Sequence, residues 1–235
     1  MPTAQDITDL ANEVTQKLED LRNAVNKVLD WVPWGLGWIA DKIKGAWNGL
    51  MDKVKSVWDP IAYYFSHLGS PSSLTATANT WSTQVGSVVS ARVGEADAGS
   101  LAVDDNWDGD AAEQYRQELL LQKTALTNIK TQFTDGISGA LKDMSSALVQ
   151  FWVSCLAALG ALIASAITAI ATAATIFGAP AAPFILGGGV AIFGIAFWGA
   201  NEILKGQANG AKTTLTQKLS DNSGYPGGAW PVATV

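Results

Sequence analysis

The chain has 235 residues, which is enough for one large domain or two small ones. Hydrophobic residues make up 48% of it and charged residues only 15%, against about 25% charged residues in typical soluble domains. The net charge of −6 and the lack of any Lys/Arg cluster exclude a general nucleic-acid binder, because phosphate contacts need a concentrated basic surface.

Residues suited to catalysis or metal binding are scarce. Cys155 is the single cysteine and His67 the single histidine, so neither an internal disulfide nor a His/Cys metal cage can form. A Ser-His-Asp triad has no G-x-S-x-G sequence to support it. We therefore expect a non-enzymatic protein without cofactor, metal or small-molecule substrate, in which Cys155 serves as a small buried hydrophobe.

The first 30 residues predict an amphipathic helix. Its apolar side chains recur at steps of three and four and so share one face, and Pro33 is expected to end it. These side chains are Ile7, Leu10, Val14, Leu18, Leu21, Val25 and Val28. The polar, acidic start lacks the features of a secretory signal peptide, so we expect any export to proceed without a cleavable one.

A second amphipathic helix is predicted from Trp38 to Trp58, in a region rich in tryptophan. Tryptophan prefers the headgroup layer of a membrane and lysine can extend from it into water, which suits an interfacial helix. The same pattern also suits an ordinary bundle helix whose indoles fill a core. The tryptophans of this region are Trp31, Trp34, Trp38, Trp47 and Trp58.

Two further helices are predicted after a boundary near residue 70. Asp59-Pro60 interrupts the chain first, and Ser70-Pro71 then supplies a cap and a first-turn proline. Helical spacing follows over residues 74–93, and residues 94–108 look like a loop. A long helix begins at Ala111 and runs past Met144 without a stop signal.

No charged side chain occurs between Asp143 and Glu202. The first apolar segment, 147–177, would extend about 46 Å as a helix, more than the ~30 Å hydrocarbon core of a bilayer. The second, 184–200, is near the lower limit for spanning it. The glycine and prolines between them break the helix, so the pair predicts an apolar helical hairpin. Its candidate membrane residues are Phe151, Trp152, Gly160, Ala164, Gly178, Pro180, Pro183, Gly188, Phe193 and Trp198.

The distribution of charge around this hairpin suits insertion from one side of a membrane. Lys142 and Asp143 precede it and Glu202 and Lys205 follow it, whereas its tip carries no charge that would have to cross hydrocarbon. Its Ala- and Gly-rich composition makes insertion only marginally favourable. Two states are thus open: a hairpin stored in a soluble bundle and released into lipid, or a permanently buried core.

The sequence Asn106-Trp107-Asp108-Gly109-Asp110, followed by Tyr115 on the next helix, resembles the W-x-G helical-hairpin family of type VII (ESX) secretion. The resemblance implies an antiparallel helix pair in which Trp107 plugs one end, Gly109 allows the tight turn and Asp110 caps the second helix. Family members are leaderless, exported and often paired as helical dimers. Their Tyr-x-x-x-Asp/Glu export element is missing here, so a partner is expected to supply the signal.

The apolar hairpin is also similar to those of helical pore-forming toxins. We therefore expect an all-α, elongated helical bundle with four segments: Trp-rich helices (1–69), a W-x-G-type hairpin (70–146), the apolar hairpin (147–204), and a short helix with a flexible tail (205–235). The expected function is a secreted or membrane-associated protein that inserts into a lipid bilayer and self-assembles, with a pore as one outcome. A homo-oligomer or a helical hetero-partner fits this expectation. A soluble secretion-associated adaptor and a constitutive integral membrane component are the alternatives.

Overall fold

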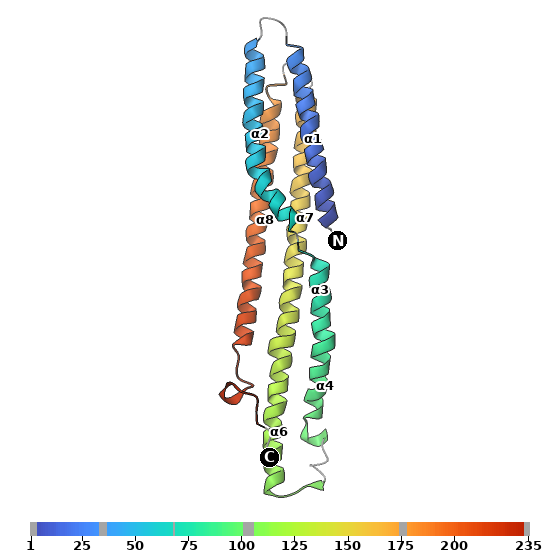
Figure 1. Cartoon of the computed structure of the whole chain (residues 1–235), viewed down its shortest axis with the longest axis vertical. Helices are drawn as coiled ribbons and strands as arrows, with labels where there is room; N and C mark the ends of the chain where they lie inside the picture. The colour runs from blue at the N-terminus through green and yellow to red at the C-terminus, as the bar shows by residue number, and fades with distance from the viewer. Residues whose placement is uncertain (1–3, 33–36, 68, 101–105, 174–177, 233–235) are drawn as a thin grey trace. The chain divides into compact units, whose positions relative to one another are not determined.

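The computed structural model describes residues 4–32, 37–67, 69–100, 106–173 and 178–232. Over these residues every regular element is helical and there is no strand, so the protein is all-α, as predicted (Figure 1). The main helices are α1 (Ala4–Asp30), α2 (Gly37–Ser66), α3 (Pro71–Thr80), α4 (Ser87–Glu95), α6 (Asp110–Asn128), α7 (Asp135–Ala173) and α8 (Ala182–Leu219). Two π-helical segments, η1 (Trp81–Gly86) and η3 (Ile129–Thr134), and two 3₁₀ turns, η2 (Ala98–Ser100) and η4 (Pro226–Gly228), complete them.

The π-helical segments join neighbouring helices, so the described residues form five continuous helices. One of these, Asp110–Ala173, is 64 residues long, and it packs against α8, which has 38. The chain divides into two compact units. Unit 1 contains residues 1–69 and 148–204, and unit 2 contains residues 70–147 and 205–235.

In unit 1, α1 buries the face that its periodicity predicts. Ile7, Val14 and Leu21 are fully buried, and Leu10 and Leu18 pack against the same core. The helix ends in a tight turn, in which the Trp31 amide donates to the Val28 carbonyl at 3.1 Å. Pro33, the predicted terminator, lies outside the described residues.

The second helix of unit 1 differs from the prediction at Pro60. Asp59-Pro60 was expected to interrupt the chain, but α2 continues through Pro60 to Ser66. Proline removes one helical hydrogen bond and clashes with the preceding turn, which bends a helix rather than ending it when packing holds both sides. Ile61, directly after the proline, is fully buried in the core, and Figure 1 shows the last part of α2 bent away from the rest.

The apolar segments form the predicted helical hairpin. A turn at residues 178–181 separates them, held by a hydrogen bond from the Ala181 amide to the Gly178 carbonyl at 2.8 Å. The second apolar helix begins at Ala182, so Pro183 lies in its first turn, where a missing amide donor is tolerated. The inner side of the hairpin packs on α1 and α2 and completes the core of unit 1.

Unit 2 begins at the predicted cap. The Ser70 hydroxyl accepts a hydrogen bond from the Ser73 amide at 3.2 Å, and Pro71 follows in the first turn of α3. The π-helical segments η1 and η3 lie against each other, since a Cβ at Gly86 would lie only 2.9 Å from Thr134 Cγ2. The predicted loop at 94–108 contains η2, and its residues 101–105 lie outside the described chain.

The C-terminal region of unit 2 also departs from the prediction. Instead of a separate short helix after residue 205, α8 runs unbroken to Leu219. Residues 220–232, expected as a flexible tail, follow α8 and contact α6 and η3. Within this stretch, Gly227 and Gly228 adopt positive φ angles of 71° and 74° in a compact turn, a conformation that glycine reaches without strain.

Candidate functional site

The inner side of the hairpin is anchored by an aromatic cluster in unit 1. The rings of Phe193 and Trp58 lie 5.8 Å apart, and the Phe197 ring lies 5.7 Å from both Tyr64 and Phe151. Phe193 and Phe197 are almost fully buried. These contacts fix the hairpin to α2 through large apolar surfaces, the kind of contact that contributes most to packing energy.

Two helix approaches in unit 1 depend on glycine. A Cβ at Gly189 would lie 2.5 Å from Ser165 Cβ, so α7 and α8 touch backbone to side chain at this level. A Cβ at Gly194 would lie 3.2 Å from Val57 Cγ1 of α2. The hairpin is therefore packed closely both within itself and onto α2.

The opposite side of the hairpin is exposed and uncharged. We call the exposed side of residues 148–201 of α7 and α8 the outer face. Ile195 and Phe184 on it are 76% and 75% exposed. Only 39% and 44% of the most apolar stretches of the two long helices are buried, whereas the core helix of a soluble protein is mostly buried. The large exposed side chains of the outer face are Val153, Ile167, Phe184, Ile192 and Ile195. Trp198 is also exposed, but its ring lies 5.8 Å from the Tyr64 ring of α2.

Three hydroxyl groups of the hairpin hydrogen-bond to its own backbone. Ser165, Thr168 and Thr172 donate to carbonyls four residues earlier at 3.0, 2.9 and 2.8 Å. Such bonds need no water, so these side chains are tolerated in hydrocarbon as well as in a protein core.

The predicted hairpin residues separate into two groups. Phe151, Trp152, Pro183 and Phe193 are buried in the core, whereas Gly160, Ala164 and Gly188 are exposed on the outer face. Trp198 is exposed beside Tyr64 of α2. Gly178 and Pro180 of the turn are partly buried. Cys155 is fully buried, as predicted for a small hydrophobe.

The predicted interfacial tryptophans also separate. Trp47 and Trp58 pack against the core, as expected for an ordinary bundle helix. Trp31 and Trp38 are 80% and 59% exposed, and the Lys42 ammonium lies 5.4 Å above the Trp38 ring. Trp34 lies outside the described residues.

The W-x-G turn of unit 2 is held by one aromatic contact. The Trp107 ring lies 5.7 Å from the Tyr115 ring, and the Arg116 guanidinium donates to the Trp107 carbonyl at 3.4 Å. Gly109 has a φ of 97°, a backbone conformation that glycine adopts without the strain other residues would have. Trp107 is 42% exposed and so covers the start of α6 rather than plugging a buried seam, and Gly109, not Asp110, occupies the cap position.

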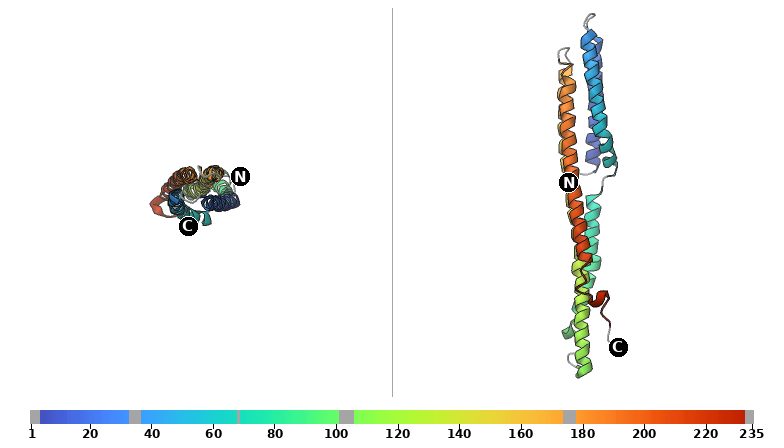
Figure 2. Two further views of the ribbon diagram at one scale, coloured as in Figure 1. Left: turned by 90° about the horizontal axis from the view of Figure 1, so that it is seen from above. Right: turned by 90° about the vertical axis from the view of Figure 1, so that its left-hand side faces the viewer.

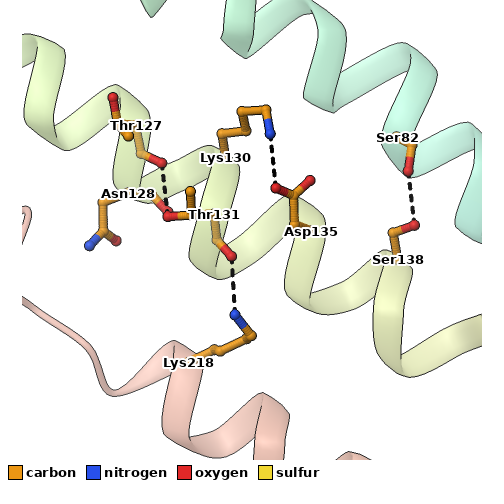
Figure 3. Close-up of polar contacts among 8 residues, drawn as sticks. All are labelled: Ser82, Thr127, Asn128, Lys130, Thr131, Asp135, Ser138 and Lys218. Carbon is orange, nitrogen blue, oxygen red and sulfur yellow. Dashed lines mark hydrogen bonds and ion pairs between the residues drawn. The ribbon is translucent and has the colours of Figure 1, made fainter. Parts of the chain in front are cut away.

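Sequence reasoning missed a row of hydroxyl contacts between the two helices of unit 2. Thr75 and Ser145 lie 2.9 Å apart between their hydroxyl oxygens, and Ser82 and Ser138 lie 2.8 Å apart (Figure 3). Each helix contributes at a spacing of seven residues, which is the repeat of antiparallel helix packing. That spacing was visible in the sequence, but short polar residues usually indicate a solvated face.

The contacts of the C-terminal segment, residues 220–232, were missed as well. Its partners recur along one stripe of α6 and η3: Gln132 donates to Asp221 at 2.8 Å, Asn128 to Ser223 at 3.4 Å, and Tyr225 to the Ala125 carbonyl at 3.5 Å. Figure 3 shows the preceding Lys218 donating to the Thr131 carbonyl, at 3.3 Å. No periodic pattern in the sequence of this segment predicts these contacts.

The described residues contain no group of three or more His, Cys, Asp or Glu side chains that could hold a metal ion. Fold and surface together define an all-α protein with two long apolar helices packed together, each long and apolar enough to cross a membrane by length and composition. The chain matches no protein-family model, no curated protein and no solved structure.

Proposed function

We propose that this chain is a non-enzymatic protein that inserts its apolar hairpin into a lipid bilayer. The observation that carries the proposal is the outer face: residues 144–201 contain no charged side chain, and the described part of the hairpin leaves large apolar side chains exposed on one side. Exposed apolar patches of this kind indicate a membrane or protein partner.

The packing of unit 1 supports storage of the hairpin in water and its release in lipid. In water, α1 and α2 cover the inner side through Phe193, Phe197 and Leu186, which keeps part of the apolar surface away from solvent. In lipid, both sides of the hairpin find an apolar environment, and the polar helices are free to leave it. A bilayer therefore shifts a balance between two arrangements by binding one of them better.

We also propose a relation to the W-x-G substrates of type VII secretion, with export that needs no cleavable signal peptide. The glycine-dependent turn at Gly109 and the Trp107–Tyr115 contact support it. Self-assembly into a pore would follow insertion, since the outer face carries small residues that let helices approach closely, such as Gly160 and Ala164.

A disulfide between α2 and the hairpin tests the insertion. In a Cys155→Ala background, Val57→Cys and Gly194→Cys place two thiols at a contact where the Gly194 Cβ would lie 3.2 Å from Val57 Cγ1, close to what a disulfide needs. We expect the reduced protein to bind phosphatidylcholine vesicles and release an enclosed dye. Oxidation should reduce the release at least about tenfold, because the hairpin can then no longer leave α2.

Ser82→Cys with Ser138→Cys is the matched control. Its disulfide joins two helices of unit 2, where the hydroxyl oxygens lie 2.8 Å apart, and should leave dye release unchanged. Equal release from the oxidised and reduced Val57/Gly194 pair would contradict release of the hairpin. A soluble protein that ignores vesicles would favour the adaptor, and one that is extracted only by detergent would favour an integral membrane component.

A further inference from the structure

One end of unit 1 carries large aromatic side chains that are mostly exposed and add little to the core. Trp31 is 80% exposed, Trp38 59% and Phe184 75%. Elsewhere in α2, Trp47 and Trp58 pack against the core, so exposure is not a general property of the tryptophans in this region. Leaving two indoles in water forgoes much of the free energy their burial would give.

These three side chains belong to the end of unit 1 at which α1 ends and α2 and α8 begin. Lys27 of α1 and Trp31, in the turn that follows α1, line one groove together with Ile170, which is near the end of α7. Phe184 and Pro183, at the start of α8, line another with Ala46 and Gly49 of α2. Figures 1 and 2 show the end of α1 and the start of α2 at the same end of unit 1 as the start of α8.

The chemistry of this end suits the boundary between water and lipid. Indole rings combine a broad apolar surface with one N–H donor and prefer the headgroup layer. The Lys42 ammonium above Trp38 can extend toward lipid phosphates while its stem stays beside the ring. The charged side chains nearest in sequence to the two indoles, Lys27, Asp30, Asp41 and Lys42, sum to zero, so attraction to anionic lipid is not needed. Asp30 and Asp41 would keep α1 and α2 from sinking further.

We infer that this aromatic end, defined by Trp31, Trp38 and Phe184, is the part of the protein that first contacts a bilayer. The inference rests on the proposed function and adds to it which end of unit 1 meets the membrane first. The indoles anchor in the headgroup layer and hold the uncharged tip, residues 178–183, against the membrane. The hairpin then follows tip first, and no charged group among the described tip residues has to cross the hydrocarbon.

Two exposed aromatics of this end can be removed without touching the core. Trp31→Ala with Trp38→Ala is compared with Leu120→Ala and Trp230→Ala, a pair in unit 2 with 63% and 45% exposure. Binding is measured by flotation with phosphatidylcholine vesicles, with and without added phosphatidylglycerol. We expect the first pair to lower the partition coefficient at least about tenfold on both lipids and the second pair to leave it within about twofold.

A second measurement reports the direction of insertion. An environment-sensitive dye is placed at Ala181→Cys in the tip or at Ala157→Cys on the outer face, each in the Cys155→Ala background, and its emission is followed after mixing with vesicles. The tip dye should change first. Simultaneous change at both positions, or unchanged binding of the Trp31/Trp38 variant, would overturn the inference while leaving insertion intact.

The absence of binding and dye response in every variant, including the unsubstituted chain, would instead overturn the proposed function itself. A Trp31/Trp38 variant that binds vesicles normally but loses a dimer seen by light scattering would assign this end to a second copy of the chain.

Discussion

Two neighbouring glycines in α8 differ in whether the packing of the hairpin leaves room for one added methyl group. Gly188 faces open space, whereas a Cβ at Gly189 would lie 2.5 Å from Ser165 Cβ. Both residues are helical, so alanine improves the helix propensity equally at both positions. Their difference therefore isolates the packing between α7 and α8.

We expect Gly189→Ala to lower the free energy of unfolding by about 1–2 kcal/mol, because overpacking outweighs the gain in propensity. Gly188→Ala should raise it by about 0.5–1 kcal/mol. Urea denaturation followed by circular dichroism measures both. A stabilising Gly189→Ala would show that the two apolar helices are not in close contact.

At the scale of the element, the C-terminal segment, residues 220–232, forms a strap along α6 and η3. Gly224 is required at its centre, since a Cβ there would lie 2.5 Å from Asn128 Cβ. Asp221 lies near the start of the strap, and its pKa is below the ordinary value of 3.8. The main cause is a hydrogen bond from the Ser223 side chain to the carboxylate, followed by one from the Ser223 amide. The nearby positive charge of Lys218 lowers the pKa further.

The sign of the pH dependence follows from this lowered pKa. A carboxylate with a lower pKa in the folded state stabilises the strap above its ordinary pKa, and that contribution is lost as the pH falls through the folded value. We expect the strap to loosen below about pH 3.8. Fluorine NMR of 5-fluorotryptophan-labelled protein, with the Trp230 signal assigned by Trp230→Phe, follows it. Asp221→Asn should remove this transition, and an unchanged transition in that variant would assign it to another group.

At the scale of the whole molecule, the two units differ in what they bury. Unit 1 buries large side chains such as Phe193, Phe197 and Leu159. Among the described residues of unit 2, the buried side chains are small: alanine, serine, threonine, glycine, proline and one asparagine. Buried apolar area supplies most of the stability of a packed unit, so unit 2 should open more easily.

We expect hydrogen exchange to reveal this difference. Backbone amides of α6 should exchange at least about tenfold faster than those of residues 151–166 in α7, because local opening needs less free energy where fewer large side chains are buried. Mass spectrometry of peptic fragments in the absence of lipid measures both regions. Slower exchange in α6 than in α7 would contradict the expectation that local stability follows the size of the buried side chains.

Much of the helical architecture was predictable from the sequence. Apolar steps of three and four fixed α1 and its buried face, and Ser70-Pro71 fixed the start of α3. Pro60 misled the prediction, because proline marks a helix end only when no packing holds the helix on both sides of it. The C-terminal strap was unpredictable, since its contacts with Gln132, Asn128 and Ala125 are distant in sequence and follow no period.

The sequence alone determined that residues 144–201 form a charge-free apolar region broken by Gly178-Ala179-Pro180, because composition and helix breakers act locally. It could not determine which side of that region is covered. In α1, polar residues mark the exposed side, but in the hairpin both sides are apolar and no residue type marks either. Only the tertiary structure decided that Phe193 and Phe197 face α2 while Ile192 and Ile195 face outward, because that choice depends on where the helices of unit 1 touch.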